Sequence, residues 1–514
     1  MAEKFSVVVI GAGLGGLSAA GYLAKAGKSV LVLEHHAVPG GYAHEFRRGL
    51  YRFEVALHAL DGAAPGGWAY AVLSELDVLN AVRFRRLDPF YVARFPQHEI
   101  TAHADPHQYE AELIRCFPHE AEGIRSLIDA MLRVFWEVRR YVADSELGRR
   151  PPMEQAPVRY PNMIAAMTQS WADFMAPHIR DPQLQGVLST LWGYYGLPPS
   201  RLNAATFIIP WVSYHLFGAY YPEGGSMAMS RALERTIMAH GGQVRYRQTV
   251  TRVEVRDGLA AAVETDTGLR VEADALVSNA NAPDTLLKLV GREHLPQDYV
   301  GRVKSARPAL SNLIVYLGLN RRLSASEWPH HEAFVADGYD AEADYKAVMA
   351  GQFERAGLVV AHYTHADPTC APDKGDVLVV MTLAPWDYGD QWGTGGDLTN
   401  YRRNPRYLEL KRDAGERLIE RAEKLVPGLR SAIKYLEIAT PLTNVRYTLN
   451  PGGSIYGSEQ SVENMYLGRL REKTPIPNLF LTGAWVTGGG MSAALLSGRN
   501  TANIVRRYLA GKKA

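Results

Sequence analysis

The first residues whose spacing could support chemistry are the N-terminal glycines in Gly11-Ala12-Gly13-Leu14-Gly15-Gly16. In a G-x-G-x-x-G pattern the first glycine permits a tight turn, the second lets backbone approach a pyrophosphate, and the third lets a helix pack closely. Glu34 follows at the distance where a carboxylate can accept hydrogen bonds from a ribose. The pattern predicts a dinucleotide site. Its expected contacts are Gly11, Gly13, Leu14, Gly15, Gly16 and Glu34.

The flanking segments have the composition that this site needs. Phe5 to Ile10 is a short apolar run typical of a buried parallel strand, and Leu17 to Lys25 is expected to form a helix. Ser29 to Leu33 predicts a second strand, which ends in Glu34. The helix would offer free N–H groups to the phosphates. A plain glycine turn is the alternative, but strand, helix and acid together favour a nucleotide, either NAD or FAD.

A second glycine cluster lies near the C-terminus, in the segment 477–499. Here a predicted strand ends in Gly483, and Gly488-Gly489-Gly490 opens a predicted helix that begins with Met491 and Ser492. Glycines before a helix permit close backbone approach, and a helix N-terminus stabilises negative charge. The cluster therefore predicts a second wall of a cofactor site, with a plain glycine-rich loop as the alternative.

Several motifs together resemble the FAD-dependent phytoene desaturase, carotenoid isomerase and retinol saturase superfamily, with a leaning to the retinol saturase branch. They are Pro39-Gly40-Gly41, Phe46 to His58, Trp192 to Pro199, Tyr221 to Met227, Leu276 to Asn281, Thr440 to Thr443, Gly452 to Gly457 and Pro477 to Arg499. The resemblance covers nearly the whole chain and implies FAD. It adds these cofactor contacts: Gly40, Gly41, Tyr42, Val250, Gly483, Gly489, Gly490, Met491 and Ser492. Tyr42 stands where many desaturases have arginine, and Ala56 replaces a common glycine.

The expected fold class is α/β (α+β overall), with a Rossmann-type FAD-binding domain assembled from discontinuous segments. The landmarks assign 1–75, 221–300 and 430–514 to this domain, and 76–220 and 301–429 to a substrate-binding cap domain. The cap should contain a helical part, including Ala121 to Val142, and a sheet with strands at Leu310 to Leu317, Leu358 to Tyr363 and Asp376 to Leu383.

Aromatic residues are dense between Trp192 and Tyr221, in a stretch with few charges. Such a group could line a long apolar pocket for a polyene or acyl chain, or could be ordinary core. The predicted substrate contacts are Trp192, Tyr195, Trp211, Tyr214 and Phe217. Relatives of this superfamily act on lipids, which favours a hydrophobic small-molecule substrate.

The chain has no G-x-S-x-G, H-E-x-x-H or Walker motif, so the chemistry is assigned to the flavin. We expect an oxidoreductase acting on CH–CH groups, with hydride transfer at flavin N5 and proton transfer by a side chain or water. Candidates for the proton step or substrate anchoring are His58, Tyr456, Arg446 and His215, each of which could equally be structural. Rival hypotheses are an unsaturated fatty acyl substrate, an amine or protoporphyrinogen oxidase, and a non-catalytic prenyl-lipid escort protein.

Composition narrows the partners and the location. Lys and Arg total 56 against 54 Asp and Glu, so the net charge of +2 gives no field that would attract nucleic acid. The two cysteines have no metal-binding spacing, no metal is expected, and a cytoplasmic location fits best. The basic tail 506–513 is compatible with peripheral membrane contact. No second G-x-G-x-x-G motif offers a nicotinamide site, so NAD(P)H could serve only as an external donor; the sequence leaves the oligomeric state open.

Overall fold

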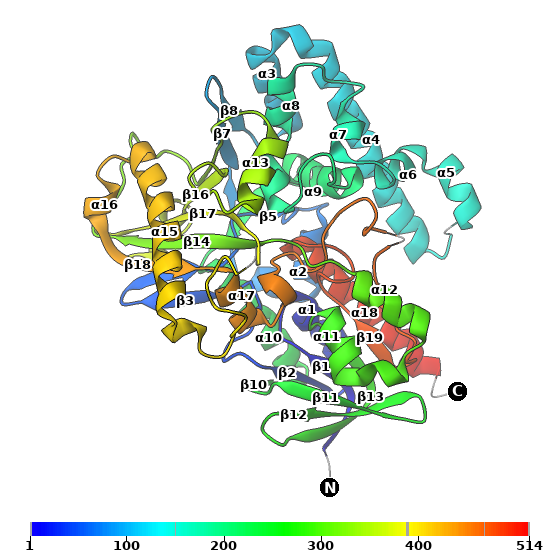
Figure 1. Ribbon diagram of the computed structural model, residues 1–514. Coiled ribbons are helices and arrows are strands. Elements are labelled where there is room, and N and C mark those ends of the chain that lie inside the picture. The colour runs from blue at the N-terminus through cyan, green and yellow to red at the C-terminus, as the bar shows by residue number, and fades with distance from the viewer. Residues whose placement is uncertain (1–2, 150, 387–389, 467, 512–514) are drawn as a thin grey trace.

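The computed structural model describes residues 3–149, 151–386, 390–466 and 468–511. Lys512 and Lys513 of the basic tail lie outside the described residues. Figure 1 shows a lower sheet near both termini, a second sheet beside a long helix, and a group of helices at the opposite end. The expected α/β class with a Rossmann-type part is confirmed.

The lower sheet has the strand order β10-β2-β1-β13-β12-β11, with β19 pairing to β13. Its strands are β1 (Glu3–Ile10), β2 (Val30–Glu34), β10 (Gln243–Tyr246), β11 (Val250–Arg256), β12 (Leu259–Thr265), β13 (Arg270–Ser278) and β19 (Leu479–Leu481). The β-branched run of β1 is buried from Val7 to Ile10, as expected of a strand covered on both faces. Helices α1 (Leu14–Lys25), α10 (Gly225–Ala239) and α18 (Met491–Gly511) pack beside it.

The register of this sheet brings distant turns together. Ile10 pairs with Ser278 and with Leu33, and Ser278 pairs with Leu481, all in parallel. The carboxyl ends of β1, β2, β13 and β19 therefore meet at one edge. The turn of the first glycine motif, Glu34 and the turn of the second glycine cluster must lie side by side there, which is where ligands bind in open α/β sheets.

The second sheet has the order β18-β14-β17-β16-β15-β7-β8. Its strands are β7 (Tyr91–Arg94), β8 (Glu99–Ala102), β14 (Ser311–Leu319), β15 (Glu332–Val335), β16 (Leu358–His362), β17 (Asp376–Ala384) and β18 (Ile433–Ala439). Every residue of β14 and β17 is buried, and α15 (Pro405–Leu425) packs against them (Figure 1). Smaller sheets join β3 (Glu45–Arg48) to β4 (Tyr51–Glu54), and β5 (Leu60–Asp61) and β6 (Phe84–Leu87) to β9 (Ala219–Pro222).

The helical layer at the upper end in Figure 1 comes from one stretch of chain. Its helices are α3 (Pro106–Cys116), α4 (Ala121–Glu146), α5 (Ala156–Arg159), α6 (Pro161–Met167), α7 (Trp171–Met175), α8 (Pro182–Leu188) and α9 (Ala204–Phe217). Asp105 and Asn203 cap α3 and α9 through their side-chain oxygens. In the part of the chain that the structure describes, no helix combines the length and the apolar composition needed to span a bilayer.

The remaining helices connect these layers. They are α2 (Trp68–Glu75), α11 (Ala282–Asp284), α12 (Gln297–Ser305), α13 (Ala341–Met349), α14 (Tyr363–Ala366), α16 (Leu429–Ala432) and α17 (Pro441–Thr448). The domain boundaries stay a prediction. The strand β18 does not follow these boundaries. It lies within the segment assigned to FAD binding, yet it pairs with β14 in the second sheet.

Candidate active site

The first glycine turn forms a close-packed cradle. A Cβ atom on Gly16 would lie 2.1 Å from the carbonyl oxygen of Gly11, so only glycine lets α1 approach the turn this closely. The Glu34 carboxylate is held at the edge of the turn, since Oε2 accepts from the Ala12 N–H at 2.6 Å and Oε1 accepts from the His36 N–H at 2.7 Å. Each carboxylate oxygen keeps a second lone pair that can accept from a ribose hydroxyl.

Asn279 joins the two glycine clusters, and the sequence analysis gave it no role. Its side chain lies 2.6 Å from the position of a Cβ on Gly13 and 2.5 Å from that on Gly483. Gly483 has a φ of 88°, and its N–H donates to Ser497 Oγ at 2.8 Å. The sequence signal for Asn279 was its place in the Leu276 to Asn281 motif, one of those that carry the superfamily resemblance. Because the strand ends meet at one edge of the sheet, Asn279 contacts both glycine turns.

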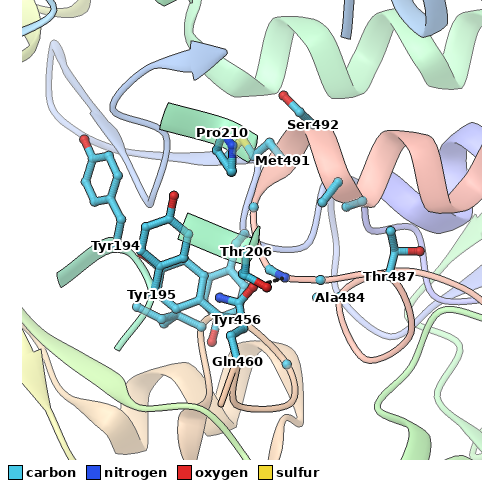
Figure 2. A pocket seen from close by; sticks show the side chains of 18 of the residues that line it. Tyr194, Tyr195, Thr206, Pro210, Tyr456, Gln460, Ala484, Thr487, Met491 and Ser492 are labelled. Carbon is cyan, nitrogen blue, oxygen red and sulfur yellow. Dashed lines mark hydrogen bonds between the residues drawn. The ribbon is translucent and has the colours of Figure 1, made fainter. Parts of the chain in front are cut away.

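The N-terminus of α18 forms the other wall. Figure 2 shows Met491 and Ser492 at its start, with Gln460 accepting from the Gly489 N–H at 3.3 Å. Ser492 Oγ donates to Asp61 Oδ1 at 2.5 Å, and burial raises the pKa of this carboxyl. Asp61 is a second residue that sequence reasoning missed, because it lies far from the C-terminal motif along the chain.

One large cavity of about 2120 Å³ runs along both glycine clusters and into the helical layer. Pockets for single drug-sized ligands usually measure about 300–1,000 Å³, so this cavity can hold a dinucleotide and a second ligand. Gly16 and Gly483 pack behind its surface. The predicted cofactor residues that line it are Gly11, Gly13, Leu14, Gly15, Glu34, Gly40, Gly41, Tyr42, Val250, Gly489, Gly490, Met491 and Ser492.

Of the five predicted substrate contacts, Trp192, Tyr195 and Tyr214 line the cavity. Figure 2 shows Tyr194, Tyr195 and Tyr456 on one side of this space. Burial, reinforced by nearby carboxylates, raises the pKa of Tyr194, Tyr195, Tyr214 and Tyr456 above the ordinary range. The tyrosine wall is therefore uncharged at neutral pH and suits an apolar ligand.

The other two predicted contacts are not among the lining residues. Trp211 is buried against His215, with ring centroids 4.0 Å apart, and against Tyr109. Phe217 packs on Phe135 and under the Arg139 guanidinium, 5.5 Å from its ring centroid. The structure thus places both side chains away from the cavity lining, and their assignment as substrate contacts stays a prediction; the inner and outer faces of α9 look alike in sequence when both are aromatic.

The candidates for the proton step also divide. His58 and Tyr456 line the cavity, whereas His215 and Arg446 do not. His215 is enclosed among aromatic rings, and burial lowers its pKa to about 3. Arg446 is exposed on α17 and lies over the Tyr447 ring. Neither lines the cavity, and their assignment to the proton step stays a prediction that this placement does not favour.

His58 contacts a residue that sequence reasoning missed entirely. Its Nδ1 lies 3.1 Å from Oε1 of Glu332, a fully buried residue at the start of β15. The other oxygen, Oε2, accepts from the Tyr194 hydroxyl at 2.6 Å. Nothing in the sequence around Glu332 distinguished it from a surface acid, because its burial depends on the second sheet.

A Rossmann-type cradle closed by a distant glycine turn, and opening into an apolar chamber, is the arrangement of an FAD-dependent oxidoreductase. The family model described as flavin containing amine oxidoreductase matches residues 14–387, and the chain belongs to this family. FAD is the cofactor, and the cradle fits it. Within the family, the superfamily resemblance found in the sequence is confirmed by the curated relatives.

Two curated relatives match over nearly the whole chain. Prolycopene isomerase 2, chloroplastic, from an Oncidium hybrid cultivar is 26% identical over 100% of this chain and 85% of its own. All-trans-retinol 13,14-reductase from Macaca fascicularis is 28% identical over 96% of this chain and 84% of its own. An oxidoreductase structure from Methanosarcina mazei shares the fold, with a TM-score of 0.64, 19% identity and coverage of 97% of this chain and 100% of that one.

Proposed function

We propose that this oxidoreductase acts on carbon–carbon bonds of a hydrophobic polyene or isoprenoid lipid, by saturation, desaturation or isomerisation. The observation that carries the proposal is the continuity of one cavity from the glycine cradle to a wall of neutral tyrosines. The names of the two curated relatives, one an isomerase of prolycopene and one a reductase of retinol, support the same substrate class.

The bound flavin supplies hydride exchange at N5. The residues of the chain would bind the cofactor and the substrate, exclude water and move the proton. Gly13 and Glu34 would hold the pyrophosphate and adenosine ribose, and the N-terminus of α18 would stabilise negative charge on the ring. Tyr195 and Tyr456 would hold an apolar chain and exclude water, while His58 is the lining imidazole placed to exchange a proton with a ligand in the chamber.

The test begins with the absorption spectrum of the purified protein, followed by anaerobic photoreduction. The reduced protein is then mixed in turn with retinol, a carotenoid and a polyunsaturated fatty acid. Reoxidation by one of these lipids would show that it is being saturated, and chromatography of the recovered lipid would detect redox-neutral isomerisation. A flavin-loaded protein that leaves every lipid unchanged would contradict the proposal, as would a protein unable to bind flavin, which would favour the escort hypothesis.

An amine substrate is the second candidate, and one observation favours it. The carboxyl group of Asp61 lines the same chamber and that of Glu332 lies near its tyrosines; in the ionised form either would attract an ammonium group. Hydrogen peroxide release with an aliphatic amine under air, and none with a lipid, would select this candidate. External reduction by NAD(P)H and peripheral membrane contact are further proposals, tested by flavin bleaching with NAD(P)H and by vesicle sedimentation.

A further inference from the structure

Glu332 carries a carboxylate in the interior of the protein, where such a group is costly. It is fully buried, and no Lys or Arg forms an ion pair with it among the described residues. A buried carboxylate costs several kcal/mol unless its oxygens are paired. Oε2 has the Tyr194 hydroxyl, and Oε1 has only the imidazole of His58 within ion-pair distance.

Residues 331 and 332 hold His58 at two points. The His331 ring donates from Nε2 to the His58 carbonyl at 2.8 Å, and Glu332 faces the His58 ring at Nδ1. The Tyr194 ring also stacks on the imidazole, with centroids 5.9 Å apart and planes 29° apart. The backbone, ring plane and one ring nitrogen of His58 are thus all fixed from the second sheet and the helical layer.

The contacts of Nδ1 favour one tautomer of the His58 ring. Tyr363 Oη lies 3.5 Å from Nδ1, but the carboxylate oxygen is closer at 3.1 Å and can only accept when ionised. A lone pair on Nδ1 would face this oxygen unfavourably, so the ionised carboxylate favours a proton on Nδ1. Nε2, which no described residue engages, is left as the free nitrogen of a residue that lines the cavity.

We propose that Glu332 is the positioning residue of a carboxylate–imidazole pair that makes His58 Nε2 the proton-exchange atom of the chamber, with Tyr194 as its second anchor. This inference rests on the proposed function. The Nδ1–H is not aligned well enough to give Oε1 a full hydrogen bond. Such contacts in ligand-free sites are commonly loose and tighten when substrate binds.

The step is a proton transfer only. During saturation the Nε2–H bond breaks and a C–H bond forms at the carbon that does not receive hydride, while the π bond supplies the electron pair for this new bond. A bound reduced flavin would supply the hydride, and an external two-electron donor such as a reduced nicotinamide would reduce the flavin again. The positive charge that His58 carries before transfer is stabilised by Glu332. Solvent returns the proton to Nε2 afterwards.

The substrate-independent test uses Glu332→Gln in the FAD-loaded protein. The rate at which diethyl pyrocarbonate modifies His58 is followed by peptide mass spectrometry across pH, because only the neutral imidazole reacts. Removing an opposite charge at this distance typically shifts the midpoint by about 1–3 pH units. We expect the midpoint to fall by about one unit or more, and an unchanged midpoint would overturn the proposal. The groups facing this ring are Glu332, Tyr194 and Tyr363, with His331 behind its carbonyl.

The matched control is Glu234→Gln. Glu234 is also a buried carboxylate that accepts a hydrogen bond from a phenol, Tyr246, but its ion-pair partner is Arg231 and not His58. It should leave the His58 midpoint unchanged. If Glu332→Gln loses its FAD, Glu332→Asp carries the same test with a smaller shift in the same direction, since its carboxylate lies one methylene further from Nδ1.

Activity measurements separate a positioning role of Glu332 from a purely structural one. With the lipid that the wild type converts, Glu332→Gln should lower kcat about 100-fold, the lower end of general acid–base contributions, with KM within about twofold. It should cause no further loss in a His58→Gln background, because both residues act through one atom. An equal additional loss there would overturn the pair. If the wild type converts no lipid, the proposed function fails while the modification midpoint still decides the pair.

Discussion

The nucleotide cradle and the tyrosine chamber are two ends of one cavity, but they are built differently. The cradle depends on short contiguous motifs, in which Gly16 packs on Gly11 and Glu34 closes the turn of the neighbouring strand. The chamber draws single residues from distant elements, such as Tyr195 from the helical layer and Tyr456 from the C-terminal part. The comparison teaches that the shared cofactor site is local in sequence, whereas the part that selects a substrate is a product of tertiary packing.

Gly16→Ala tests the cradle. Its new Cβ would lie 2.1 Å from the backbone oxygen of Gly11, which cannot move without displacing the turn. We expect FAD affinity to fall more than about tenfold, or 1.4 kcal/mol, measured as the ratio of flavin to protein absorbance after dialysis. Gly301→Ala, at a helix position with nothing within 4 Å, is the control. Full flavin retention in Gly16→Ala would break the distinction between the two regions.

Trp211→Ala tests whether Trp211 belongs to the chamber. Because Trp211 is 2% exposed and packs on His215 and Tyr109, its removal should cost roughly 3–5 kcal/mol of stability. The KM for substrate in the surviving folded enzyme should stay unchanged. Tyr456→Ala, which alters the lining, should raise KM instead. Thermal melts and steady-state kinetics on both variants check this, and a KM effect of Trp211→Ala would return that residue to the chamber.

Acid should weaken the support of His58 through His331. Burial lowers the pKa of His331 to about 4 from an ordinary value near 6.5. Between these values the unfolded chain binds the proton first, so stability is fully present above pH 6.5 and falls as the pH drops toward 4. The loss should approach about 3 kcal/mol. His331→Gln should flatten this part of the stability profile, measured by denaturant titration from pH 4 to 7; an equally steep profile would contradict the assignment.

The smallest effect should come from Arg446→Ala. This side chain is exposed and contacts the Tyr447 ring, so the change in stability should stay within about 0.5 kcal/mol and kcat should be unaffected. His58→Gln is the comparison, with an expected loss of about 100-fold in kcat. Measuring kcat of both variants under the same conditions checks this difference. A large loss in Arg446→Ala would restore the original assignment and show that α17 moves toward the cavity.

The sequence by itself determined the cofactor and the fold class, because Gly11, Gly16 and Glu34 act through local turn geometry and through their place at strand ends. Only the tertiary structure decided which aromatics face the cavity, since Tyr214 and Trp211 share one helix and differ only in the direction they point. The same holds for Asn279, Asp61 and Glu332. Their roles depend on strand register and burial, which bring together residues hundreds of positions apart and which no local pattern encodes.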